Sequence, residues 1–69
     1  MQIKLNENIK KYRKSMNLTQ EELAEAFGVT VGAVSKWESG ASDPSTSNLI
    51  ALAKLFNISA EELLKEVQA

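Results

Sequence analysis

The stretch TQEELAEAFGVTVGAVSKWESG, from Thr19 to Gly40, predicts two short amphipathic helices joined by a tight turn. This outline is that of a helix-turn-helix, which occurs in DNA-binding proteins and also as a plain packing unit. The order of the residues inside the stretch must therefore distinguish a DNA-binding pair of helices from a structural corner.

The first helix of the pair has a defined start and a defined end. Thr19 precedes Glu22 by three residues, the spacing of a capping box for a helix that begins at Gln20. Ala24 lies where a bulky side chain would hold the two helices apart, and Gly28 ends the helix where the chain needs a positive φ.

The second helix of the pair, at about 30–39, has Thr30 as its N-cap and Gly40 at its C-terminal end. Val34 and Trp37 lie one turn apart and predict its buried face. We interpret Trp37 as an anchor of the core, with a stacking surface for bases as the alternative. The whole arrangement favours a DNA-docking helix pair over a purely structural corner.

Helical periodicity continues on both sides of this pair and predicts an all-α chain. A polar loop from Ala41 to Ser47 precedes two further helices, and Ser59 and Glu62 repeat the capping-box spacing before the last one. The expected inward residues are Leu5, Ile9, Tyr12 and Met16 in the first helix, Leu49, Leu52, Ala53 and Phe56 in the fourth, and Leu63, Leu64 and Val67 in the fifth. We therefore expect a single domain over 1–69, a compact bundle of five helices.

The composition excludes several classes of function. The chain contains no cysteine and no histidine, so it lacks disulfides, the commonest zinc ligands and the usual general base. It has no glycine-rich phosphate loop, and we expect no enzyme, no cofactor and no metal site. No apolar run approaches the roughly 20 residues that cross a bilayer, so we expect a soluble cytoplasmic protein with no membrane partner.

Charge is distributed unevenly along the chain. The net charge is −1, but residues 1–18 carry +4 and residues 19–69 carry −5. Lys10, Lys11 and Lys14 in the first helix form either a solvated helix face or a surface that faces a nucleic acid.

The chain resembles the phage-repressor and Cro-like helix-turn-helix family, also called the xenobiotic-response-element type, from Leu5 to Leu64. The residues that carry the resemblance are Ile9, Arg13, Leu18 to Ala24, Phe27 to Val29, Val34 to Glu38, Gly40, Pro44, Leu49, Leu52, Ala53, Ile58, Ser59 and Leu63. It implies a lambda-repressor-like bundle whose third helix enters the major groove of double-stranded DNA. It also implies a homodimer on a palindromic operator and a transcriptional regulator that acts as a repressor.

The resemblance places the DNA contacts on the helix pair. The expected DNA-binding residues are Thr19, Gln20, Thr30, Val31, Gly32, Ser35, Lys36 and Ser39. Gln20 is expected to position a phosphate, whereas Lys36 is expected to make the main directional contact to a base, preferably guanine. Val31 and Ala33 are able to touch thymine methyls, and Gly32 removes bulk where the DNA approaches the backbone. The alternative for Lys36 is a solvated surface lysine.

The recognition surface departs from the family's usual pattern in two respects. Relatives commonly offer glutamine, arginine or asparagine to the bases, whereas only Ser35 and Lys36 have polar side chains here. The loop residues Ala41, Ser42 and Asp43 stand where many relatives have basic residues. We therefore expect modest affinity and a shallow dependence on salt.

Two further expectations concern the scaffold and the partners. The family often pairs an arginine in the first helix with a glutamate at the end of the third, so we interpret Arg13 and Glu38 as a structural ion pair. Homodimerisation is expected through the C-terminal helices, where Ile50, Leu55, Leu64 and Val67 either form the contact or complete a monomeric core. The alternative function is a protein-interaction or antitoxin-like module on the same fold, with weak or no DNA binding.

Overall fold

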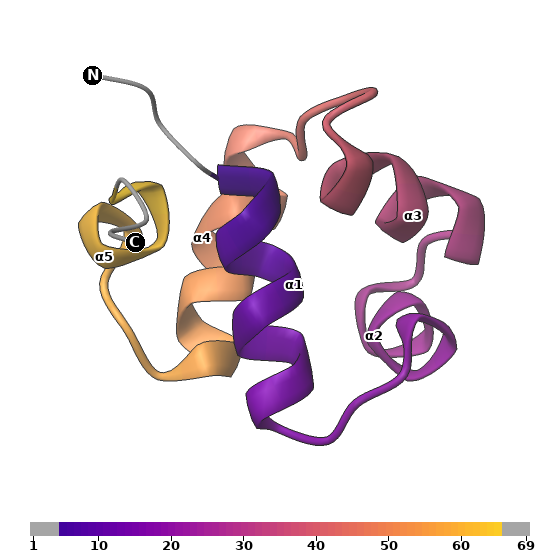
Figure 1. Ribbon diagram of the computed structural model, residues 1–69, viewed down its shortest axis with the longest axis horizontal. Coiled ribbons are helices and arrows are strands. Elements are labelled where there is room, and N and C mark those ends of the chain that lie inside the picture. The colour runs from indigo at the N-terminus through magenta and orange to yellow at the C-terminus, as the bar shows by residue number, and fades with distance from the viewer. Residues whose placement is uncertain (1–4, 66–69) are drawn as a thin grey trace.

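The computed structural model describes residues 5–65, which form five helices and no strand. The helices are α1 (Leu5–Ser15), α2 (Gln20–Phe27), α3 (Val31–Ser39), α4 (Thr46–Phe56) and α5 (Ala60–Leu64). In Figure 1, α1 stands in the centre in front of α4, with α2 and α3 on one side and α5 on the other. The expected bundle of five helices is confirmed.

One hydrophobic core joins all the helices. Each helix contributes one side chain with 0% exposure, and these are Ile9, Leu23, Val34, Leu52 and Leu63. Burying such a side chain contributes about 1.5–3 kcal/mol relative to leaving it exposed, so every helix is tied to the same core. Aromatic contacts extend this core: Tyr12 stacks on Phe56 with ring centroids 5.6 Å apart, and Phe27 meets Trp37 edge to face at 6.2 Å.

The start and end of α2 follow the pattern of its capping residues. The Thr19 hydroxyl accepts from the Glu22 N–H at 3.0 Å, and the Glu22 carboxylate accepts from the Thr19 N–H at 2.8 Å, which completes the capping box. Gly28 then takes the left-handed conformation with φ 66°, and the next residue, Val29, donates to the carbonyl of Ala24 at 3.0 Å. The turn between the two helices of the motif is therefore confirmed.

Helix α3 is capped in the same way at both ends. Thr30 accepts from the Ala33 N–H at 3.1 Å, and Gly40 has φ 84° and donates its N–H to the carbonyl of Lys36. Trp37 is 5% exposed, so its predicted place in the core is confirmed.

Some expected boundaries and orientations are wrong. Helix α1 ends at Ser15, where Asn17 turns the chain with φ 59°, and Met16 is therefore 42% exposed and outside the apolar stripe. The loop after α3 is shorter than expected, because the Ser45 hydroxyl accepts from the Asn48 N–H and starts α4 at Thr46.

The C-terminal half also differs in detail. Ser59 accepts from the Glu62 N–H, but within residues 5–65 only this half of the expected capping box is formed. Leu55, for which a dimer contact and a place in the core were the two alternatives, packs against the core, whereas Ile50 is 47% exposed. Val67 lies outside the described residues.

A buried asparagine fastens α5 to α1. The Asn8 side-chain amide donates to the carbonyls of Leu63 at 2.8 Å and Lys65 at 2.6 Å, and Asn8 is only 4% exposed. The amide thus satisfies carbonyls at the C-terminal end of α5 that have no partner inside the helix.

None of the helices described between residues 5 and 65 is long and apolar enough to cross a membrane.

Candidate nucleic-acid interface

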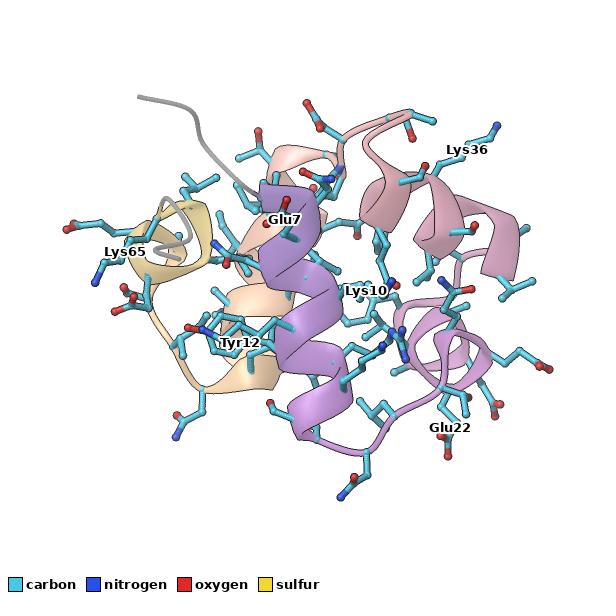
Figure 2. All side chains as sticks on the ribbon, viewed as in Figure 1. Glu7, Lys10, Tyr12, Glu22, Lys36 and Lys65 are labelled. Atoms are coloured by element: carbon cyan, nitrogen blue, oxygen red, sulfur yellow. The ribbon has the colours of Figure 1, made fainter. Side chains whose placement is uncertain are left out.

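Helix α3 presents one buried face and one exposed face. The buried residues are Val34, Trp37 and Glu38, and Ala33 is half-buried at the edge. The exposed residues, which we call the outer face, are Val31, Gly32, Ser35, Lys36 and Ser39. These positions recur at helical spacing, so all the expected base-facing residues except Ala33 lie together on one open side of the helix. Figure 2 shows Lys36 extending from α3 away from the body of the bundle.

The inner face of α3 is held to α1 by a buried ion pair. Arg13 Nε donates to Glu38 Oε2 at 2.6 Å, and Arg13 Nη2 donates to Glu38 Oε1 at 3.1 Å. The remaining nitrogen, Nη1, donates to the carbonyl of Leu18 at 2.7 Å. The Glu38 side chain is 4% exposed, so the bidentate geometry satisfies charges that would otherwise be costly to bury. The expected structural pair is confirmed.

Gln20 joins this ion pair from α2. Its side-chain Nε2 donates to Glu38 Oε1 at 3.1 Å, and the residue is half-buried. A carboxylate only accepts hydrogen bonds, so this contact directs the NH₂ end of the Gln20 amide toward α3. The amide nitrogen still has a second hydrogen to donate. Gln20 therefore belongs to the joint between α2 and α3, a role that its position in the sequence did not indicate.

The hydroxyl groups among the expected DNA contacts are already used in the scaffold. Thr19 and Thr30 accept backbone N–H groups as N-caps. Ser39 Oγ donates to the carbonyl of Lys36 at 3.2 Å and accepts from the Ala41 N–H at 3.3 Å. A threonine hydroxyl that accepts retains its own hydrogen for an outside acceptor, whereas the hydrogen of Ser39 is already donated. The threonines are therefore better placed than Ser39 to contact a phosphate.

The charges around the outer face are few. Glu38 neutralises Arg13, which removes that guanidinium from the basic surface of α1. Lys10 extends from α1 on the side of α2 and α3 in Figure 2, whereas the Lys11 ammonium lies 5.5 Å from the ring centroid of Tyr12. The exposed carboxylates of Glu21 and Glu25 on α2 oppose this positive charge. Besides Lys11, the exposed cations on α1 and α3 are Lys10, Lys14 and Lys36.

The described residues do not form a site for a metal ion. Between residues 5 and 65, no group of three or more acidic side chains comes together as metal ligands, and the chain has no histidine or cysteine. Chemistry at the outer face of α3 therefore rests on hydrogen bonds, apolar contacts and one ammonium group.

Comparison with known proteins connects this geometry to a family. The family described as "Helix-turn-helix" matches residues 9–63. The chain is 42% identical over 62 residues to the HTH-type transcriptional activator BcrR of Enterococcus faecalis, covering 90% of this chain and 30% of that protein. It is 34% identical over 61 residues to the cryptic phage CTXphi transcriptional repressor RstR of Vibrio cholerae, covering 88% of this chain and 54% of that protein.

A solved structure shows the same fold with similar sequence. The P22 c2 repressor protein, determined in complex with a synthetic operator, superposes with a TM-score of 0.82 and 35% identity. The superposition covers 94% of this chain and 97% of the repressor chain. Against the curated relatives BcrR and RstR, in contrast, this chain spans only about a third to a half of the protein's length.

Proposed function

The chain belongs to the helix-turn-helix family, and from this premise we propose that it binds specific double-stranded DNA and regulates transcription as a repressor. The observation that carries the proposal is the outer face of α3, an open helix side held rigidly by a buried ion pair behind it. A helix of this kind fits the major groove of B-DNA. The similarity to a repressor solved on its operator supports the same placement.

The proposed contacts divide into those that read bases and those that position the protein. Lys36 donates to guanine acceptors, Ser35 adds a hydrogen bond, and Val31 meets a thymine methyl. Phosphate contacts come from residues around the helix starts, namely Thr19, Gln20 and Thr30, whereas the Ser39 hydroxyl already donates its hydrogen to the carbonyl of Lys36. For Gln20 we assign the second hydrogen of its amide nitrogen, because the first is donated to Glu38.

We propose a homodimer on a palindromic operator, formed through the C-terminal helices. Ile50 on α4 is 47% exposed, so its side chain is accessible for such a contact. A two-fold dimer would place its recognition helices about 34 Å apart, one turn of DNA.

We also propose that the protein acts in the cytoplasm, where it would reach an operator. We assign it no catalytic role.

Selection of bound duplexes from a random DNA pool tests the proposal. We expect a palindromic sequence to be enriched, and a reporter placed behind that sequence to be repressed when the protein is present. The reporter decides the sign of regulation, because BcrR is named an activator and RstR a repressor. A pool with no enriched sequence would favour the protein-interaction module on the same fold.

The contact from Lys36 has its own prediction. Replacing Lys36 with alanine should weaken binding to the selected operator by about 1–3 kcal/mol and relax the preference at one base pair. Lys11→Ala is the matched control, because Lys11 is also exposed but lies on α1 with its ammonium over the ring of Tyr12. Equal operator affinities for the two variants would show that Lys36 is a solvated surface lysine without a contact to a base.

A further inference from the structure

Two of the three glycines are required by the backbone and one is not. Gly28 and Gly40 end α2 and α3 with φ 66° and 84°, in the left-handed region that side chains rarely adopt. Gly32, in contrast, is the second residue of α3, within the helix and outside that region. A glycine inside a helix weakens the helix relative to alanine, so its presence at this position calls for a separate explanation.

The interior of the bundle does not supply this explanation. A Cβ atom added at Gly32 would meet only the hydroxyl oxygen of Thr30, at the ordinary contact distance of 3.8 Å. Gly32 is itself exposed, so an alanine methyl would point toward solvent in the free protein. The fold would therefore accept alanine, and its helix would gain from it.

The surroundings of Gly32 indicate what the missing side chain leaves room for. Gly32 lies between Val31 and Ala33 and one turn before Ser35 and Lys36, on the outer face. Val31 is 44% exposed, so the surface beside the bare backbone is apolar. Among the groups that base pairs present in the major groove, the C5-methyl of thymine is the apolar one.

We propose that Gly32 determines specificity by leaving space for a thymine methyl against the backbone of α3. The inference rests on the proposed function and adds to it a preference for an A·T pair and the residue responsible, Gly32. The Val31 side chain and the bare Gly32 backbone leave room for a methyl, whereas a polar base edge in the same place would depend on Ser35 and Lys36, one turn later, for side-chain hydrogen bonds. The glycine thus exchanges helix stability for a close approach of α3 to an A·T pair.

The primary test compares stability and DNA affinity in the same variant. Gly32→Ala should raise Tm by roughly 2–8 °C, because alanine strengthens the helix. It should also weaken binding to the selected operator by roughly tenfold or more, because the added methyl competes with the thymine methyl for one space. A rise in Tm also shows that the variant is folded. Operator affinity that is unchanged or tighter would overturn the inference.

A control separates the effect of space from that of helix stability. Ala26→Gly alters an exposed position on α2, away from the outer face of α3. We expect it to lower Tm by a similar amount and to leave affinity unchanged. If this variant binds as weakly as Gly32→Ala, the loss does not depend on space at the outer face of α3, and the inference is wrong.

Changes in the DNA identify the methyl group itself. Each thymine of the selected operator is replaced in turn with deoxyuridine, which lacks the C5-methyl. At the position facing Gly32, we expect deoxyuridine to lower the operator affinity of the wild-type protein. For the Gly32→Ala variant, we expect the same replacement to restore most of the lost affinity. Loss of binding by Gly32→Ala with no rescue at any thymine would overturn the assignment to a methyl.

These outcomes distinguish the inference from the proposed function. If the wild-type protein selects no operator, both fail. If it selects an operator and Gly32→Ala binds as well as the wild type, only the inference about Gly32 fails.

Discussion

The two faces of α3 show how nine residues separate the stability of the bundle from the DNA recognition that we propose. The inner face, with Val34, Trp37 and Glu38, is buried against α1 and α2, whereas the outer face exposes Ser35 and Lys36. Neighbours in the sequence thus have opposite tasks, because successive helical residues point about 100° apart. Changes on the inner face should reduce stability first, whereas changes on the outer face should reduce DNA binding without destabilising the fold.

The inner face contains a buried carboxylate that accepts hydrogen bonds from two other helices. The Glu38 carboxylate accepts two hydrogen bonds from Arg13 on α1 and one from Gln20 on α2. One buried group therefore fixes the angle of α3 relative to two other helices. The outer face offers few polar side chains, so the proposed recognition of DNA would depend strongly on the placement of the helix.

The largest effect that we expect follows from Glu38→Gln. The buried Arg13 charge would lose its carboxylate partner, and the free energy of unfolding should fall by about 3 kcal/mol. Urea denaturation measures the change, with Glu25→Gln on the exposed side of α2 as the control. The control should change stability by no more than about 0.5 kcal/mol. Similar small losses in both variants would remove the ion pair from the explanation of stability.

A smaller effect is expected at Gln20, which belongs to both regions. Gln20→Met keeps the length of the side chain but removes the amide, so stability should fall by about 1 kcal/mol through the lost bond to Glu38. Operator affinity, measured where both proteins are fully folded, should fall severalfold because the phosphate contact is also lost. Lower stability with unchanged affinity would place Gln20 wholly in the scaffold.

The smallest effect concerns salt and tests the weak charge of the outer face. With Lys10 and Lys36 as the main cations near it, a plot of log affinity against log salt should be shallow. We expect a slope no steeper than about −6 per dimer, using roughly −0.9 for each phosphate neutralised. A steeper slope would show that further basic residues reach the DNA, and Lys14→Ala would then identify whether a second lysine of α1 contributes.

Local patterns in the sequence predicted most of the fold. The caps at Thr19, Gly28, Thr30 and Gly40 act over at most five residues, so their spacing was enough to place α2 and α3. Helix boundaries were less predictable where polar residues compete for the cap, as at Ser45, which starts α4 before the expected end of the loop. The ion pair between Arg13 and Glu38 was also foreseen, through the resemblance to a family rather than through local spacing.

Two polar residues had no sequence signal for the roles that they have in the structure. In the sequence, Asn8 is an ordinary polar residue of an amphipathic helix. In the structure it is buried, and its amide donates to the carbonyl of Leu63, 55 positions later. Gln20 reads as the exposed first residue of a helix, yet its amide reaches Glu38 on another helix. Both contacts depend on the angles at which the helices pack, which side-chain periodicity does not specify.

The sequence by itself determined the helices, their caps and the set of small side chains on the outer face of α3, because these depend on neighbours within one or two turns. The tertiary structure decided which polar groups meet across helices, since a hydrogen bond needs its donor and acceptor within about 3 Å. It also decided the meaning of Gly32. The backbone requires glycine at Gly28 and Gly40, because both have a positive φ. At Gly32 a Cβ atom would fit without a clash, so the fold does not require a glycine there.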